Sequence, residues 1–429
     1  MKRASSIQVW LIVLLCIGLL ACQKNNEIKA ATPGESGVKQ SVDEVAASPS
    51  FGSDAISLYE SWPKETELDN PEIPEATDLW ISIIDAAKES IDFSEYYAIS
   101  APDSDLERVI EAIKRAGSRG VKIRFIVDKG MLRDDNAILP TQIAQWPNTE
   151  LRIIDFSAIT GGVQHAKYFI IDKKIAYFGS QNFDWRSLEH ISELGALVQN
   201  PELVLPLQET FELDWALAGD RSAEYTKSEH TMPVRIVYKG EETQVTSALS
   251  PKDLLPDPAL WDLPQILELI ANAKKRIDIQ LLNYTITNYD KSSFTEIDDA
   301  LIAAAERGVK VRLMVSDWSK RKKYIADLQR LEPINNIESK MIVIPEASTG
   351  FIPFARTIHS KFMVVDEDAA WLGTSNWSGD YFYNSRNVGI VVKGRAFNKD
   401  LSHSFELYWD SAYAESTDPQ KQYEERKRY

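Results

Sequence analysis

Two stretches of the sequence decide the fold, and each is a copy of the other. Residues 165–182 read HAKYFIIDKKIAYFGSQN, and residues 359–376 read HSKFMVVDEDAAWLGTSN. Both contain a histidine, a lysine two positions later, an aspartate five positions after the lysine, and an asparagine at the end. The offset of 194 residues between positions 165 and 359 continues to the pair Trp215 and Trp409. A register held over such a length predicts that the chain uses one structural unit twice.

The segments upstream of the two motifs repeat as well. RGVKIR at residues 119–124 matches RGVKVR at residues 307–312. Before the first of these, residues 106–113 carry apolar side chains at the spacing of an amphipathic helix. Ser104 and Glu107 are placed as a capping box, which predicts where this helix begins.

Each predicted helix is followed by a segment with the composition of a strand. Residues 121–127 follow the first helix, and residues 297–304 and 309–315 repeat helix and strand in the second half. Strand, helix and strand in this order indicate parallel pairing with crossover helices. We therefore predict an α/β fold: a duplicated α-β-α sandwich whose halves, residues 51–222 and 230–429, are related by a pseudo-two-fold axis.

The first residues have the pattern of an export signal. Two basic residues at positions 2–3 precede an apolar run over residues 9–20. This run is too short to span a bilayer comfortably, and together with the basic residues it predicts a signal peptide over residues 1–22. The run ends in Leu-Leu-Ala-Cys22, which resembles the lipobox of bacterial lipoproteins and implies lipidation of Cys22. An uncleaved signal anchor is the alternative. Residues 23–50 read as a flexible linker, so we expect an exported protein held by lipid on the periplasmic or cell-surface side, with the outer membrane favoured.

Composition excludes several kinds of site. The chain has two cysteines, Cys16 and Cys22, and both lie in the predicted signal, so a disulfide, a zinc-thiolate site and a cysteine nucleophile are excluded from the mature part. The formal net charge of −16 argues against broad, sequence-independent binding to long nucleic acid, which requires extensive basic surface. A local basic pocket for one phosphate is compatible with this charge.

The repeated motif is suited to phosphodiester chemistry. Residues i and i+2 of a strand point to the same face, so His165 projects with Lys167, and His359 with Lys361. If the two halves meet, two imidazoles and two ammonium groups converge, and these charges can neutralise the non-bridging oxygens of a phosphodiester. One imidazole can attack phosphorus while the other protonates the leaving oxygen, so we expect neither a metal nor another cofactor. The motif side chains expected to bind the substrate phosphate are Ser180, Asn182, Thr374 and Asn376.

The spacing His-x-Lys-x4-Asp-x6-Gly-(Ser/Thr)-x-Asn, present twice, resembles the signature of the phospholipase D superfamily. The flanks GSQNFDWRSL at 179–188 and GTSNWSGDYF at 373–382 resemble the branch of endolysosomal phospholipase D-like 5′ exonucleases and poxviral envelope phospholipase-like proteins. The resemblance implies a phosphohistidine intermediate, with His165 as nucleophile and His359 as general acid. It implies a substrate that is either single-stranded nucleic acid or phospholipid.

One further site residue follows from the resemblance. Some members carry an acidic residue at the position of Glu193 that hydrogen-bonds the nucleophilic histidine, and it would orient the imidazole. The corresponding residue of the second half is Asn387, so the two histidines are not equivalent. This asymmetry alone does not fix their roles.

Other prominent residues are expected to be structural. Asp172 and Asp366 lie at a predicted turn beyond the His-Lys pair, and we expect them to hold structure by hydrogen bonds. Trp215 and Trp409 are expected in the core. The remaining histidines have no repeat partner, so we expect His190, His230 and His403 to be structural or surface residues. Seven aromatic side chains could stack on bases, contact acyl chains or belong to the core: Tyr96, Tyr97, Trp185, Tyr284, Trp377, Tyr381 and Phe382.

Two alternatives to a metal-independent phosphodiesterase remain open at this stage. A phosphatidyl transferase resembling phospholipid and cardiolipin synthases would share the intermediate and differ in the acceptor. A non-catalytic binding protein on the same scaffold is disfavoured because both His-Lys pairs are intact. Since one chain carries both motifs, it needs no partner to complete a pocket, and we expect a monomer.

Overall fold

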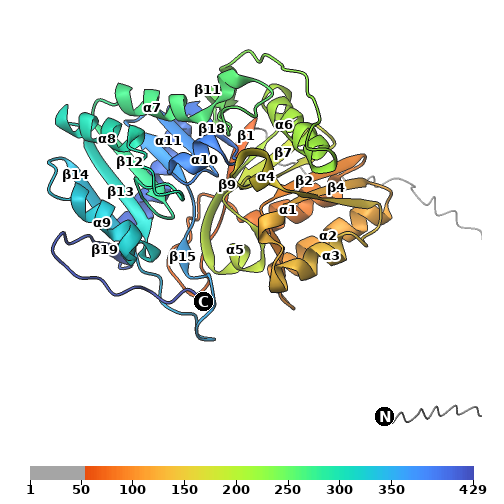
Figure 1. Ribbon diagram of the computed structural model, residues 1–429, viewed down its shortest axis with the longest axis horizontal. Helices are drawn as coiled ribbons and strands as arrows, with labels where there is room; N and C mark the ends of the chain where they lie inside the picture. Colours follow the sequence, from red (N-terminus) through yellow and green to blue (C-terminus); the bar gives the residue numbers. More distant parts are fainter. Residues whose placement is uncertain (1–53) are drawn as a thin grey trace, which may run out of the picture. The chain divides into compact units, whose positions relative to one another are not determined.

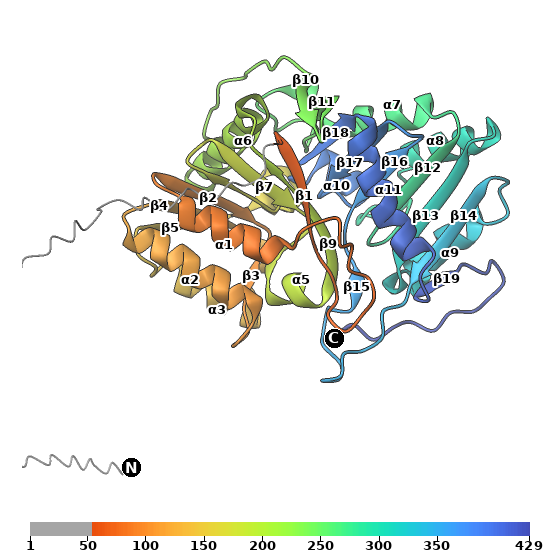
Figure 2. The same ribbon diagram turned by 180° about the vertical axis from the view of Figure 1, so that it is seen from behind.

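The computed structural model of the protein describes residues 54–429, drawn in Figures 1 and 2. The predicted signal peptide 1–22, with Cys22, and the predicted linker 23–50 lie outside the described residues. Within residues 54–429, no helix has both the length and the apolar character needed to cross a membrane.

The first half of the chain builds a mixed sheet around the first motif. Across the sheet, its strands are β1 (Ile56–Ser61), β9 (Ile191–Val198), β7 (Ile175–Gly179), β6 (Tyr168–Ile171), β2 (Ser90–Glu95), β4 (Lys122–Asp128) and β5 (Thr149–Ile154). The strands β2, β4 and β5 pair in parallel, as predicted, whereas the motif strands β6 and β7 form an antiparallel pair. A separate two-stranded sheet joins β3 (Ala98–Ile99) to β8 (Phe183–Asp184).

The second half repeats this plan. Across its sheet, the strands are β10 (Val234–Tyr238), β11 (Glu241–Ser247), β18 (Gly389–Lys393), β17 (Ala369–Gly373), β16 (Phe362–Val365), β12 (Arg276–Leu281), β13 (Lys310–Ser316), β14 (Ile337–Ile342) and β19 (Ala414–Ser416). Here β12, β13 and β14 are parallel, and the motif strands β16 and β17 are again antiparallel. The strand β15 (Thr357–Ile358) leaves its own half and pairs in parallel with β9 of the first half.

Helices cover both faces of each sheet. The long ones are α1 (Ala76–Ala86), α2 (Asp105–Ser118), α6 (Pro201–Gly219), α7 (Asp262–Asn272), α8 (Glu296–Glu306), α9 (Lys322–Leu331) and α11 (Arg395–Trp409); the short ones are α3 (Ile138–Ile143), α4 (Phe156–Thr160), α5 (Trp185–Glu189) and α10 (Gly379–Tyr383). The apolar stripe predicted for α2 is buried, as its spacing requires. Ser104 is the N-cap residue of α2, as predicted, but the capping box is wrong, because the Ser104 hydroxyl donates to the Ala101 carbonyl oxygen and makes no hydrogen bond to the helix.

One apolar core joins the two halves. It contains side chains from both sheets together with α6 and α11, so these two helices pack in a shared central layer. The helix pairs α1/α2 and α7/α8 cover the outer faces through two further cores. Figure 1 shows the first half in orange to yellow-green beside the second half in green to blue, with β9 and β15 where they meet. The duplicated α/β sandwich predicted from the repeat is therefore confirmed, whereas the domain boundaries remain a prediction.

The repeated tryptophans lie in the shared core, as predicted. Trp215 and Trp409 are 8% and 4% exposed. Each stacks on a phenylalanine one helical turn earlier and lies close to an arginine. The Arg124 guanidinium is 5.2 Å from the centroid of the Trp215 ring, and that of Arg312 is 5.1 Å from the centroid of the Trp409 ring. Both arginines are also ion-paired to sheet and helix carboxylates, so the repeat extends to the contacts that join sheet to helix.

The two motif aspartates hold structure through hydrogen bonds, as predicted. Each sits in the turn after the first motif strand with a positive φ, 51° for Asp172 and 52° for Asp366, a conformation that aspartate tolerates better than most residues. Each carboxylate accepts hydrogen bonds from three consecutive backbone N–H groups at the start of a neighbouring strand, residues 88–90 and 274–276. Burial raises the pKa of Asp366, but these hydrogen bonds outweigh it and leave the pKa lowered.

Candidate active site

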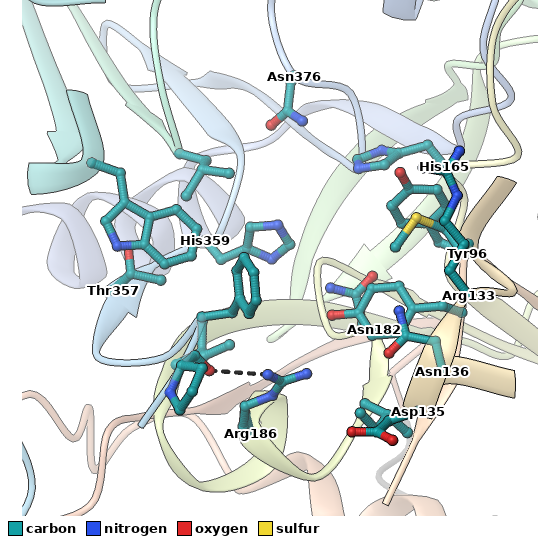
Figure 3. Close-up of a pocket in the computed structure, with 18 of the residues that line it drawn as sticks. Tyr96, Arg133, Asp135, Asn136, His165, Asn182, Arg186, Thr357, His359 and Asn376 are labelled. Atoms are coloured by element: carbon teal, nitrogen blue, oxygen red, sulfur yellow. Dashed lines mark hydrogen bonds between the residues drawn. The ribbon is translucent and has the colours of Figure 1, made fainter. Parts of the chain in front are cut away.

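A pocket of about 590 Å³ opens between the two halves, and both motifs contribute to its lining. Figure 3 shows His165 and His359 on opposite sides of this pocket, with Asn376 above and Asn182 below the space between them. The segments that adjoin the motif strands of the two sheets therefore bring the four side chains to one cavity.

Each histidine is anchored by the backbone of the other half. The His165 N–H donates to the Arg386 carbonyl oxygen at 3.0 Å, and the His359 N–H donates to the Ser192 carbonyl oxygen at 2.8 Å. Ser192 belongs to β9, which pairs with β15 directly before His359. Neither half by itself holds its own histidine in place, so the site depends on the junction between them.

The His165 side chain has a neutral partner that fixes its tautomer. Its Nδ1 lies 3.0 Å from the Oδ1 of Asn387. The Asn387 amide nitrogen is surrounded by the Ser250 hydroxyl and by the carbonyl oxygens of Tyr381 and Ser385 at 3.0–3.2 Å, so its oxygen must face His165. A neutral His165 then carries its proton on Nδ1, and its Nε2 presents a lone pair.

The His359 side chain has a carboxyl partner, which differs from what the sequence predicted. Its Nδ1 lies 2.8 Å and 2.9 Å from the two carboxylate oxygens of Glu193. The expected contact of Glu193 with His165 is wrong, because β9 carries Glu193 across the junction to the histidine of the second half. Burial raises the pKa of the fully buried Glu193 to about 8, and the positive charge of Lys361 opposes this rise. Glu193 and His359 thus form a buried pair that can hold one proton between them.

Burial and nearby positive charge lower the pKa of both imidazoles. Burial lowers the pKa of His165 well below its usual value, and Lys167 and Lys361 lower it further. The same causes lower the pKa of His359, with Lys361 ahead of Lys167. Burial also lowers the pKa of Lys361 to about 7, against the opposing charge of Glu193. A dianionic or monoanionic phosphate entering this site would offset the mutual repulsion of these groups.

The two lysines are buried beside the histidines and do not line the pocket. Lys167 is 2% exposed and Lys361 is fully buried. Each ammonium donates to the carbonyl oxygen of the histidine in its own motif. Both charges act on His165 and on His359, so the predicted convergence of two imidazoles and two ammonium groups is present.

The predicted phosphate-binding residues fall into two groups. Asn182 and Asn376 line the pocket, and the side-chain oxygen of each has no hydrogen-bond partner among the described residues. Ser180 and Thr374 are buried and face the protein instead, which corrects their predicted role. The Ser180 hydroxyl accepts from the Leu194 N–H, and the Thr374 hydroxyl donates to the Asn387 oxygen. The Ser180 hydroxyl thus supports the strand that carries Glu193, and the Thr374 hydroxyl supports the Asn387 side chain.

Aromatic rings enclose the first histidine. The His165 ring lies between the rings of Tyr96 and Tyr381, with centroids 5.2 Å and 4.9 Å away and edge-on geometry. The Lys167 ammonium is 5.0 Å from the centroid of the Tyr96 ring. These ring contacts hold the His165 imidazole in one orientation, in which it faces the pocket.

The other predicted aromatic residues separate into lining and core. Tyr97 also lines the pocket, whereas Tyr284, Trp377 and Phe382 are buried in the core of the second half, and Trp185 packs against the core of the first. Sequence reasoning missed several lining residues, because they lie in loops and short helical turns outside the repeated motifs. They include Arg133, Asn136, Arg186, Trp318 and Phe354. The one available signal was that Arg133 and Trp318 closely follow the parallel strands β4 and β13, whose carboxyl ends meet at one edge of each sheet.

The remaining histidines lie away from the pocket lining. His230 contacts Asp257, His403 contacts Glu72 at the surface, and His190 packs against Trp185. Burial lowers the pKa of His190 to about 4. Over residues 54–429, no group of three or more His, Cys, Asp and Glu side chains is arranged to hold a metal ion.

Comparison with known proteins identifies the family. The family model described as "Cardiolipin synthase, PLD-like domain" matches the chain twice, over residues 80–215 and 266–409. The "Probable phospholipase D F09G2.8" of Caenorhabditis elegans is 33% identical to this chain, and the alignment covers 78% of this chain and 66% of that protein. The rat "5'-3' exonuclease PLD3" is 30% identical, and the alignment covers 84% of this chain and 80% of that protein.

A solved structure supports the fold alone. Phosphatidylserine synthase of Haemophilus influenzae superimposes with a TM-score of 0.59 at 12% identity, covering 79% of this chain and 84% of that one. The two matches of the family model each contain one of the two motifs together with the central strands of its sheet. The chain belongs to the phospholipase D superfamily.

Proposed function

We propose that this phospholipase D-like phosphodiesterase hydrolyses single-stranded nucleic acid through a phosphohistidine intermediate, without a metal ion. The observation that carries the proposal is the unequal pairing of the two histidines that face one pocket. His165 is paired with a neutral amide, whereas His359 is paired with a carboxylate. A neutral acceptor leaves an imidazole free to act as nucleophile, and a carboxylate stabilises an imidazolium that acts as acid.

The first step forms a nitrogen–phosphorus bond. The Nε2 lone pair of His165 attacks phosphorus, the bond from phosphorus to the leaving oxygen breaks, and the His359 imidazolium donates its Nε2 proton to that oxygen. Glu193 stabilises the positive charge of His359 before the transfer. The Asn182 and Asn376 amides and the buried ammonium groups stabilise the charge that develops on the non-bridging oxygens.

The second step reverses these roles. Neutral His359 takes a proton from a water molecule, the resulting hydroxide attacks phosphorus, and the nitrogen–phosphorus bond breaks. The product is a phosphomonoester, and both histidines return to their starting states. A transferase would use an alcohol in place of this water, so the alternative function shares the first step.

Two features support nucleic acid as the substrate. A relative that aligns over 84% of this chain is named a 5′-3′ exonuclease. The pocket is lined by the rings of Tyr96, Tyr97, Trp318, Phe354 and Tyr381, and aromatic rings bind unpaired bases by stacking with little sequence preference. Phospholipid is the competing substrate, since another relative is named a phospholipase D.

The roles of the histidines can be tested with two leaving groups. We expect His165→Ala to abolish cleavage of 5′-hydroxyl single-stranded DNA and of a nitrophenyl phosphodiester, in the presence of a chelator. His359→Ala should abolish cleavage of DNA but still release nitrophenolate in a burst, because this weakly basic leaving group needs no proton. Equal loss in both variants on both substrates would contradict the assignment of the histidine roles. If the wild-type enzyme is inactive in the chelator and regains activity only when a metal ion is added, metal independence is contradicted.

The substrate is decided in parallel. Wild type is expected to degrade the single strand and to leave phosphatidylcholine vesicles intact. Choline release with intact DNA would assign the site to phospholipid. Phosphatidyl transfer to an added alcohol would identify a transferase, and binding of both ligands without turnover would identify a non-catalytic protein.

We also propose that the protein is exported and anchored through a lipid on Cys22. The proposal is supported by the basic and apolar pattern before that cysteine. Expressed in full, the protein should fractionate with membranes, and Cys22→Ser should abolish lipid labelling. Unchanged labelling in the variant would contradict the anchor.

A further inference from the structure

The pocket has one wall built from an irregular segment. Residues 343–356 connect β14 to β15 and contribute Pro353 and Phe354 to the lining. Phe354 and Arg356 both adopt positive φ angles, 58° and 56°, which non-glycine residues seldom occupy. Such conformations persist only when surrounding contacts hold them.

The first half holds this wall segment from one side. The Arg186 guanidinium, fixed by the carboxylate of Asp184, donates to the Pro353 carbonyl oxygen at 2.9 Å, the contact drawn as a dashed line in Figure 3. The buried Arg356 donates to the carbonyl oxygens of Pro345 and Lys64. These contacts fix the ends of the segment but leave Phe354 44% exposed.

A segment near the end of the chain holds the wall from the other side. Figures 1 and 2 both show the end of the described chain close to β15. Arg426 donates to the Asp317 carboxylate at 2.5 Å, to the Ile344 carbonyl oxygen at 2.7 Å and to the Arg356 carbonyl oxygen at 3.2 Å. The Arg426 side chain therefore connects both ends of the wall segment to Asp317, which directly follows β13.

The next residues contact the lining side chains themselves. The Phe354 N–H donates to the Arg428 carbonyl oxygen at 2.7 Å. The Arg428 guanidinium lies 5.0 Å from the centroid of the Trp318 ring, and the Tyr429 ring lies 6.0 Å from the Phe354 ring at an angle of 31°. None of the residues 426–429 lines the pocket, so this segment acts on the pocket through Trp318 and Phe354.

We propose that Arg426–Tyr429 is a specificity-determining strap, which positions the Phe354 and Trp318 rings to receive the nucleobase next to the scissile phosphate. The inference rests on the proposed function and names a recognition element of the same site. The strap contacts neither histidine, so it sets how tightly the flanking part of the substrate binds and does not take part in bond breaking.

The test compares a small substrate with a large one. Bis(nitrophenyl) phosphate occupies the phosphate site, whereas a short single-stranded oligonucleotide also reaches the aromatic wall. For Arg426→Ala we expect KM for the oligonucleotide to rise about tenfold, the order of one lost stacking contact, with kcat for the small ester within about twofold of wild type. Arg426→Lys should restore part of the affinity. The matched control is Glu425→Ala, at an exposed neighbouring position, which should change neither value.

A double-variant cycle shows whether the strap acts through the wall. Once Phe354→Ala and Trp318→Ala together have removed both rings, Arg426→Ala should raise KM no further. If Arg426→Ala loses its cooperative thermal transition, Tyr429→Ala takes its place, because that side chain is 74% exposed. Additive effects, or an equal rise in KM on both substrates, would overturn the strap. Failure of wild type to cleave either ester would instead overturn the proposed function.

Discussion

The ion pair between Asp214 and Arg386 joins the two halves directly behind the active site, and its removal gives a sharp prediction. Asp214 lies on α6 of the first half, Arg386 precedes Asn387 in the second, and both side chains are fully buried. The guanidinium donates to the two carboxylate oxygens at 2.7 Å and 2.9 Å and to the carbonyl oxygens of Ser250 and Leu254 at 2.8–2.9 Å. Asp214→Ala would leave a buried positive charge without its counter-charge.

The expected cost follows from that burial. Breaking a buried ion pair by removing one partner costs about 3–5 kcal/mol, which corresponds to a shift of roughly a hundredfold to a few thousandfold in the unfolding equilibrium. An average domain has about 5–15 kcal/mol of stability, so the variant should lose a large part of it. Because the Arg386 carbonyl oxygen holds the His165 N–H, we also expect kcat to fall.

The assay is urea denaturation followed by tryptophan fluorescence, with Asp78→Ala as the control. Asp78 pairs with Arg108 at 2.8 Å, but these side chains are 70% and 54% exposed, and such surface pairs contribute about 0–1 kcal/mol. The double variant Asp214→Leu/Arg386→Met should recover most of the loss, because it removes the charge together with its partner. A cost for Asp214→Ala no larger than that of the control would refute the reasoning.

Three further predictions concern the titrating groups. In Glu193→Gln, the basic limb of the plot of kcat against pH should move to lower pH, and kcat should fall about 10²–10⁴-fold. The reason is that the carboxyl, whose pKa burial raises to about 8, no longer stabilises the His359 imidazolium. A basic limb that does not move would contradict the pairing. In Asn387→Asp, the acidic limb should move to higher pH, because a carboxylate would raise the pKa of His165; a profile identical to wild type would contradict the role of a neutral partner. Asp366→Asn should destabilise the protein near neutral pH and progressively less below about pH 4. A carboxyl whose pKa is lowered in the folded state contributes stability above its unfolded pKa, and this stability is lost as pH falls through the folded pKa. Denaturation measured across pH, with Asp368→Asn at an exposed position as the control, checks this, and a pH-independent difference would contradict it.

Much of the fold and the centre of the site followed from local sequence pattern. The motif spacing predicted that His165 lies near Lys167 and His359 near Lys361, although these residues lie directly before the strands β6 and β16 and not within them. The repeat predicted two equivalent halves, and the turn position of Asp172 and Asp366 predicted their structural hydrogen bonds. Chain order and local periodicity suffice for these features because each depends on residues close in sequence.

The tertiary structure alone decided which partner each histidine has. Glu193 follows His165 by 28 positions, yet β9 runs to the junction and delivers its carboxylate to His359. The same packing turned Ser180 and Thr374 inward, although the motif placed them beside Asn182 and Asn376.

The sequence by itself thus determined the family, the duplicated sandwich and the four residues of the two His-Lys pairs. The junction between the halves determined the acid–base partners, the unequal surroundings of the two imidazoles and the aromatic wall of the pocket. The physical reason is that these contacts join residues from different halves, such as His165 with Asn387. Their geometry depends on how two sheets and their central helices pack, and no periodicity along the chain encodes it.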